Sequence, residues 1–276
     1  MREDVLVKIC GVTNEPDALL AVGLGADAIG FILAPSPRQI AASVAADIVK
    51  RLPHDVLTVG VFRDEAPPRV VEIANTVGFG AVQLHGHETA GQCRWIRERV
   101  ACTIKAFPAG DPSIARVADF GADYLLVDGP SPGSGQVFDW RLAEGVVDTR
   151  RMFVSGGLTP ENVADAIAAL RPRGVDVSSG VEIAPGRKDP QKLRAFIRSA
   201  RAAARASAAK GAAPGPGSVA GDAAGPARSG VQGDGGDGGA SGAAAAWDER
   251  PAPGVADPRD GRDAAPYDQP YDWMER

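Results

Sequence analysis

Short apolar runs alternate with longer stretches of helical periodicity over residues 1–202 of the chain. Each run contains β-branched or aromatic residues and lacks regular polar alternation, which is typical of parallel strands buried on both faces. The eight runs that predict strands are residues 5–9, 28–33, 57–62, 81–84, 103–107, 124–127, 152–154 and 175–177.

Helix signals fill the segments between these runs. Residues 14–25 start with Asn14, a good N-cap residue. Residues 159–170 start with Thr159 as N-cap and have Pro160 at the first helical position, where proline is well tolerated. Further helical patterns lie at residues 67–78 and 113–121.

Strands that alternate with helices predict βαβ units joined by right-handed crossovers. Eight such units predict an α/β fold, the (β/α)₈ or TIM barrel, which suits a domain of about 200 residues. An open doubly wound sheet is the rival fold. Its usual G-x-G-x-x-G turn after the first strand is missing here, because the first turn reads CGVTNE.

Composition changes close to residue 203. The last Leu is Leu193 and the last Ile is Ile197, whereas residues 203–276 contain 20 Ala and 14 Gly among 74 residues. Such a segment buries too little apolar surface to offset its chain entropy. We therefore predict a barrel domain at residues 1–202 and a low-complexity, Ala/Gly/Pro-rich disordered tail at residues 203–276.

Charge and cysteine content exclude several classes of protein. Of the formal net charge of −5, the tail carries −4, because it has 7 Lys or Arg against 11 Asp or Glu. The barrel domain thus lacks the basic surface of a nucleic-acid-binding protein and the charge block of a membrane-surface protein. Three irregularly spaced cysteines argue against a disulfide framework. Because we find neither a signal-peptide pattern nor about 18 consecutive apolar residues, we expect a cytoplasmic protein.

The carboxyl ends of the predicted strands carry the candidate chemistry. In a (β/α)₈ barrel these ends surround the active site and form its mouth. The residues expected there are Cys10, Arg38, His85, Lys105, Asp128, Gly156 and Ser178.

Two glycine-rich turns follow the last two predicted strands. They read SGGLTPENV and DVSSGVE, and barrel phosphate sites commonly form after these two strands. Backbone N–H groups at glycines and at a helix N-terminus approach an anion closely. Either sequence alone would indicate only a tight turn, but the two together predict phosphate binding.

Asp128 and Cys10 are the candidate acid and base. Asp128 closes a buried apolar run, and the loop that follows, GPSPGSG, has the composition of a substrate cover. A structural acid that caps the next loop is the alternative for Asp128. Cys10 follows an apolar strand, where a thiolate of lowered pKa can act as a base. Core packing is the alternative for this cysteine, as it is for most others.

Three further side chains at the predicted mouth give less specific signals. The guanidinium fork of Arg38 suits a carboxylate or a phosphate, and Lys105 in a buried strand either lines the mouth or extends to solvent. His85 and His87 raise the question of a metal, but only one other His exists, at position 54, and no carboxylate cluster completes a site. We expect His85 to donate a hydrogen bond at the mouth.

Six segments then match one family in order: KICGVTN, GFILAPSPR, VQLHG, VDGPSPGSGQVFDW, SGGLTPENV and GVDVSSGVEIAPGRKD, all within residues 5–196. Together they resemble the phosphoribosylanthranilate isomerases of tryptophan biosynthesis. The resemblance implies a (β/α)₈ barrel without metal or organic cofactor. It also implies an Amadori rearrangement of N-(5-phosphoribosyl)anthranilate to 1-(2-carboxyphenylamino)-1-deoxyribulose 5-phosphate. One departure is Pro132, in a loop where the family usually has paired glycines.

The resemblance also implies roles for individual residues. Asp128 matches the general acid of the family and Cys10 matches its general base. Arg38 matches the residue that holds the anthranilate carboxylate, and Asp176 matches a position near the sugar. The residues expected to bind substrate are Arg38, His85, Lys105 and Asp176, and those expected to bind phosphate are Gly156, Gly157, Ser178, Ser179 and Gly180.

Two other hypotheses stay open. One is a different phosphate-binding barrel enzyme. A sugar-phosphate epimerase would need a set of His and Asp metal ligands, which is missing here. A dual-substrate isomerase typically uses two Asp residues, whereas the first strand here ends in Cys10. The other is a scaffold protein that acts through its tail, which ends with aromatic and acidic residues in APYDQPYDWMER. The expected partner is a small-molecule substrate, without nucleic acid or membrane, and the chain is expected to be a monomer or a homodimer.

Overall fold

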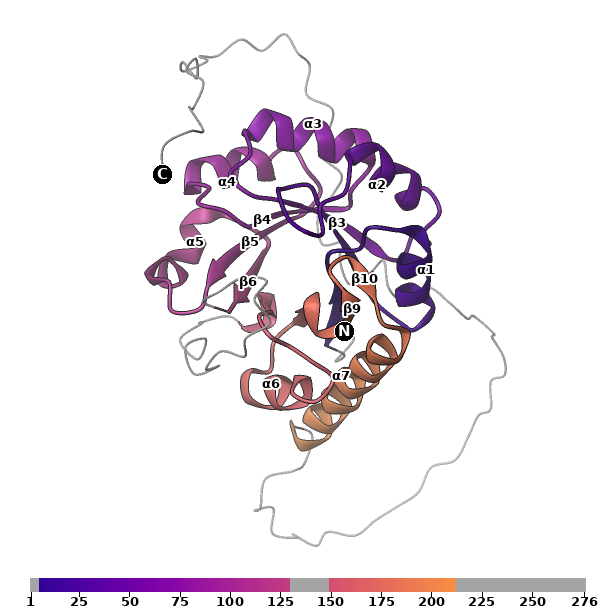
Figure 1. Cartoon of the computed structure of the whole chain (residues 1–276). Helices are drawn as coiled ribbons and strands as arrows, with labels where there is room; N and C mark the ends of the chain where they lie inside the picture. Colours follow the sequence, from indigo (N-terminus) through magenta and orange to yellow (C-terminus); the bar gives the residue numbers. More distant parts are fainter. Residues whose placement is uncertain (1–4, 130–148, 212–276) are drawn as a thin grey trace, which may run out of the picture.

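Eight parallel strands close into a barrel in the computed structural model, which describes residues 5–129 and 149–211 (Figure 1). Strand β1 pairs with β8 and completes the circle. The strands are β1 Leu6–Ile9, β2 Ala28–Ile32, β3 Leu57–Phe62, β4 Ala81–Leu84, β5 Thr103–Pro108, β6 Tyr124–Asp128, β7 Met152–Val154 and β8 Gly174–Val177. The predicted fold class is confirmed, and each predicted run overlaps one strand.

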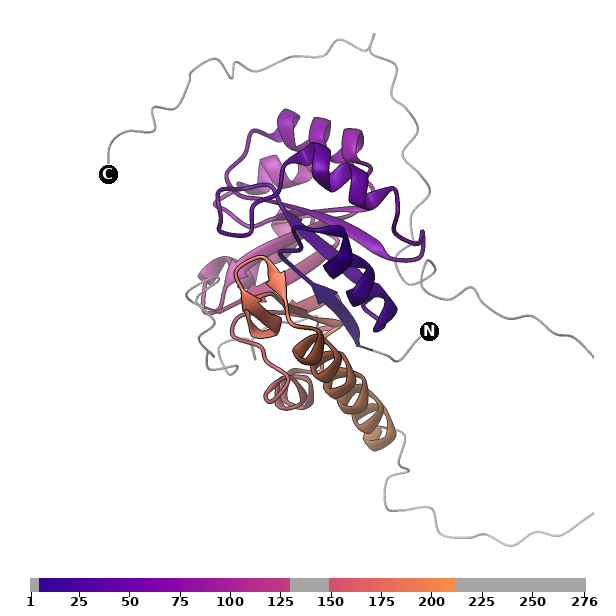
Figure 2. The ribbon, with the colours of Figure 1, turned by 45° about the vertical axis from the view of Figure 1, so that its right-hand side comes forward.

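Helices surround the barrel on its outer face (Figures 1 and 2). They are α1 Glu15–Gly23, α2 Ala42–Val49, α3 Pro67–Val77, α4 Ala90–Arg97, α5 Val117–Phe120, α6 Val163–Leu170 and α7 Pro190–Gly211. The other described elements are the 3₁₀ helices η1 Pro112–Arg116, η3 Thr149–Arg151 and η4 Ser179–Val181, and the hairpin of β9 Glu182–Ala184 and β10 Arg187–Lys188. None of the helices in the described ranges is long and apolar enough to cross a membrane.

The barrel interior has an apolar part and a polar part. Alternate residues of a strand face inward, and an apolar cluster fills the barrel with Leu6, Val59, Ile104, Leu126 and Phe153 among its members. Polar side chains follow toward the carboxyl ends of the strands, and the buried ones are Lys8, Gln83, Asp128 and Asp176. The close-packed apolar part therefore holds the strands that carry these polar groups in one arrangement.

Helix α6 starts later than its sequence predicts. It begins at Val163, and residues 159–162 form a turn. The side chain of Asn162 explains the difference: its Oδ1 accepts from the Thr159 N–H at 2.8 Å and its Nδ2 donates to the Gly157 carbonyl at 2.9 Å. Pro160 thus lies in the turn, and Asn162 ties the glycine-rich segment to the helix start.

Helix α7 extends beyond the predicted domain boundary. It continues to Gly211, and Ala204 is buried in the core. Arg201 donates to the Val5 carbonyl and forms an ion pair with Asp27 at 2.6 Å, which anchors the helix at the amino end of the barrel. Residue 202 is therefore too early a boundary. Residues 212–276 of the predicted tail, and most of the predicted substrate cover with Pro132, lie outside the described residues.

Candidate active site

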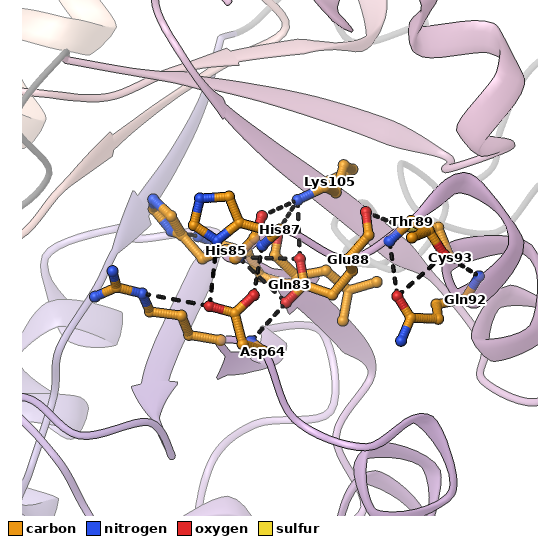
Figure 3. A network of polar contacts seen from close by, with 12 residues as sticks. Asp64, Gln83, His85, His87, Glu88, Thr89, Gln92, Cys93 and Lys105 are labelled. Atoms are coloured by element: carbon orange, nitrogen blue, oxygen red, sulfur yellow. Dashed lines mark hydrogen bonds and ion pairs between the residues drawn. The ribbon is translucent and has the colours of Figure 1, made fainter. Parts of the chain in front are cut away.

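Asp128 stands at the end of β6 with both carboxylate oxygens engaged. Its Oδ1 accepts from the Gly129 N–H at 2.9 Å, and its Oδ2 lies 3.1 Å from His85 Nε2. The amide nitrogen of Gln83 lies 2.9 Å from His85 Nδ1, so the Gln83 amide donates there and the ring proton resides on Nε2. Figure 3 shows Gln83 and His85 beside the polar contacts of Glu88 and Lys105. His85 is 24% exposed and links the buried Asp128 to solvent.

Cys10 lies one residue past β1, with its thiol inside the barrel. Its backbone N–H donates to the Val177 carbonyl at 2.8 Å. The thiol shares the space beside Gly30 with the Lys8 ammonium, since a Cβ on Gly30 would lie 2.9 Å from Cys10 Sγ and 3.1 Å from Lys8 Nζ. A glycine at this position on β2 therefore makes room for both groups.

Lys8 is fully buried and forms an ion pair with Asp176 at 2.9 Å. Burial alone lowers the pKa of Lys8, but Asp176 and Cys10 outweigh it, so the pKa stands above its usual value and the ammonium persists. Burial is the largest influence on the Cys10 thiol and raises its pKa above the usual range, while Lys8 acts in the opposite direction. Whether the Cys10 sulfur is a thiol or a thiolate thus depends on the charges around it.

Arg38 is held in place by Glu182. Its Nε and Nη2 donate to the carboxylate at 3.0 and 2.8 Å. Glu182 is also paired with Lys188, whose ammonium is 2.8 Å from Oε1 and donates to the Cys10 carbonyl at 2.6 Å. This buried network connects the loop after β2, the end of β1 and the segment after β8.

The two glycine-rich turns pack against each other. A Cβ on Gly180 would lie 1.9 Å from the Leu158 carbonyl oxygen, and one on Gly156 would lie 2.1 Å from the Gly129 nitrogen. Gly156 and Gly157 both have positive φ, 89° and 66°, which favours glycine. Ser178 Oγ is buried and has no hydrogen-bond partner among the described residues, so it is available to a ligand.

Lys105 does not lie with these groups, which corrects the expectation that it lines the mouth. It pairs in register with Leu84, whose side chain packs in the outer core, so it faces the helices. Its ammonium is 2.9 Å from Glu88 and 2.7 Å from the Gly86 carbonyl, and both charged side chains are buried (Figure 3). Lys105 is therefore a structural residue of the loop after β4.

Replacing Lys105 by methionine is expected to lower the free energy of unfolding by about 3–5 kcal/mol, because Glu88 would remain buried without its counter-charge. Urea unfolding of the full chain measures this loss. The matched control is Lys50→Met, which removes an exposed ion pair with Asp47 and is expected to change stability by at most about 1 kcal/mol. Equal losses in the two variants would contradict the structural role of Lys105.

Sequence reasoning missed four residues of this region: Lys8, Gln83, Glu182 and Lys188. Lys8 and Gln83 interrupt the apolar runs VLVKI and AVQL, and a polar side chain inside a buried strand is a usable signal. Glu182 and Lys188 gave no such signal, because they lie outside the predicted strands. Within residues 5–129 and 149–211, no group of three or more His, Cys, Asp or Glu side chains could hold a metal ion.

Asp128 at the end of β6 lies next to His85, just after β4. Together with a cysteine after β1 and paired glycine turns after β7 and β8, this arrangement is typical of phosphate-binding barrel enzymes that use acid–base chemistry. The comparisons with known proteins then identify the particular family. The chain belongs to the N-(5'-phosphoribosyl)anthranilate (PRA) isomerase family, whose pattern matches residues 7–199.

Relatives support this assignment along almost their whole length. The N-(5'-phosphoribosyl)anthranilate isomerase of Desulforudis audaxviator is 51% identical over 205 residues, which cover 72% of this chain and 98% of the relative. The crystal structure of the enzyme from Thermus thermophilus is 42% identical, with a TM-score of 0.67, and covers 71% of this chain and 98% of its own. A structure in complex with reduced 1-(o-carboxyphenylamino)-1-deoxyribulose 5-phosphate is 42% identical, with a TM-score of 0.64, and covers 72% and 99%.

Proposed function

We propose that this chain isomerises N-(5-phosphoribosyl)anthranilate to 1-(2-carboxyphenylamino)-1-deoxyribulose 5-phosphate, a step of tryptophan biosynthesis. The observation that carries the proposal is the order of groups around the barrel mouth. The glycine turns after β7 and β8 lie between Asp128 on β6 and Cys10 after β1. When the phosphate is bound at these turns, the attached sugar lies between Asp128, the acid, and Cys10, the base.

Asp128 and Cys10 act in sequence in this proposal. Asp128 is the general acid and gives a proton to the ring oxygen of the ribose as the C1–O bond breaks, and the nitrogen lone pair forms the C=N bond of a Schiff base. The Cys10 thiolate then takes the proton from C2, and the electrons of that C–H bond form C1=C2 while the C=N pair returns to nitrogen. The resulting enolamine tautomerises to the ketone by losing its hydroxyl proton and gaining a proton at C1.

The remaining residues bind the substrate. We assign the phosphate to Gly156, Gly157, Ser178, Ser179 and Gly180. Arg38, oriented by Glu182, has further N–H donors for the anthranilate carboxylate. We assign the sugar to the region next to the Lys8–Asp176 ion pair, and His85 is a hydrogen-bond donor to Asp128.

A direct assay tests the proposal. The substrate is formed in situ from anthranilate and phosphoribosyl pyrophosphate by a transferase, and the loss of its fluorescence is followed with and without EDTA. We expect turnover that does not depend on added metal. Absence of turnover under conditions where a relative from Thermus thermophilus is active would direct the search to other sugar-phosphate isomerases.

Location and assembly form part of the same proposal. The phosphorylated substrate does not cross membranes unaided, and the three cysteines are free, which fits a reducing cytoplasm. A relative from Thermotoga maritima is described as dimeric. The proposal therefore includes a monomer or a homodimer, and sedimentation of the full chain distinguishes the two.

A further inference from the structure

A fully buried ammonium lies next to the proposed catalytic sulfur. Lys8 and Cys10 are two positions apart in the chain, so their side chains point to the same face of the backbone, the barrel interior. Asp176 is opposite Lys8 in the register of β1 and β8. Burying an ammonium is costly without a counter-charge, and Asp176 at 2.9 Å supplies one.

The geometry beside Gly30 brings Lys8 and Cys10 together. A single added methyl on Gly30 would contact both Lys8 Nζ and Cys10 Sγ, at 3.1 and 2.9 Å. The ammonium thus has two neighbours that can be anionic, the Asp176 carboxylate and the Cys10 sulfur. Without a thiolate, one ion pair satisfies the charge of Lys8, and with a thiolate the same ammonium neutralises the added charge.

We propose that Lys8 is a positioning residue that supplies the counter-charge of the Cys10 thiolate, and that Asp176 competes with the sulfur for that charge. This inference rests on the proposed function, in which Cys10 is the base. It extends that function by naming the group that makes a buried cysteine usable as a base.

The other charged groups around the sulfur are consistent with this role. The groups that face Cys10 are Lys8 on β1, Asp176 on β8 and Lys188 on β10. Lys188 is directed to the Cys10 carbonyl and is paired with Glu182 at 2.8 Å, so much of its charge is compensated. Burial raises the pKa of the Cys10 thiol, Lys8 lowers it, and Asp176 raises it.

The test measures the titration of Cys10 directly in the full chain. The rate of Cys10 alkylation by iodoacetamide is followed against pH, with each cysteine resolved by peptide mass spectrometry. For Lys8→Met we expect the midpoint to rise by about 1–2 pH units, which is about a 10- to 100-fold slower reaction below the midpoint. Lys8→Arg, which keeps the charge, is expected to stay closer to the parent chain.

Two further variants make the result decisive. Asp176→Asn removes the competing carboxylate, so the Cys10 midpoint is expected to fall, and this variant also tests the inference if Lys8→Met does not fold. Lys105→Met is the matched control, because it removes a second buried lysine that lies away from Cys10. Cys93, whose pKa burial raises to about 11, is the internal reference in the parent chain and in the Lys8 variants. It is not used as a reference in Lys105→Met, because Lys105 acts on its pKa.

The outcomes separate this inference from the proposed function. A Cys10 midpoint that is unchanged in Lys8→Met, or that moves equally in Lys105→Met, overturns the role of Lys8. A midpoint that does not fall in Asp176→Asn overturns the competition. Because alkylation needs no substrate, a chain without isomerase activity would refute the proposed function while the Lys8 result stands on its own.

Discussion

Replacing Asp128 by asparagine is expected to lower kcat by about 10²–10⁴-fold, the range associated with one positioned proton donor. The amide keeps the shape of the side chain and an oxygen that can accept from Gly129 N–H, but it holds no proton that can be transferred. KM is expected to change little, because the glycine turns that bind the phosphate do not depend on this carboxylate. Steady-state fluorescence kinetics measure both quantities.

A kinetic isotope effect shows which step Asp128 serves. If ring opening becomes rate-limiting in Asp128→Asn, substrate deuterated at C2 reacts at nearly the same rate as the unlabelled compound. The control is Asp47→Asn, which changes an exposed carboxylate on α2 and is expected to have the kcat of the parent chain. A kcat within a few-fold of the parent chain in Asp128→Asn would contradict the role of Asp128 as acid.

Replacing Cys10 by alanine is expected to lower kcat by a similar factor of about 10²–10⁴, because no other group is assigned to take the C2 proton. Proton removal then becomes rate-limiting, so the C2-deuterium effect is expected to increase, opposite to the result for Asp128→Asn. The two substitutions therefore leave different isotope signatures even where their losses of rate are equal.

Cys93→Ala is the matched control for Cys10→Ala. Both thiols are free and buried, but Cys93 lies on α4 in the outer core, close to Lys105 and Glu88. We expect Cys93→Ala to lower stability without the loss of kcat. Turnover that survives in Cys10→Ala would make this cysteine a packing residue and leave the base unassigned.

The predictability of the site differs from residue to residue. Asp128, His85 and Cys10 could be placed at one mouth because each follows an apolar run, and parallel strands of a barrel end at a common edge. Lys105 was misplaced because an inward and an outward position differ by a single residue along a strand. Only its register with Leu84 and its pairing with Glu88 show that it faces outward.

The sequence by itself determined the strands, the bounds of some helices and the barrel class. These depend on local periodicity and on residues such as Gly78, which ends α3 in the left-handed conformation. It also determined the family, since six ordered motifs can be recognised without any three-dimensional information.

Only the tertiary structure decided which charged side chains form ion pairs. Lys8 and Asp176 are 168 positions apart and Arg38 and Glu182 are 144 apart, and both pairs form because barrel closure brings β8 and the segment after it back to β1 and to the loop after β2. Contacts of such long range depend on register and closure, which no local pattern encodes.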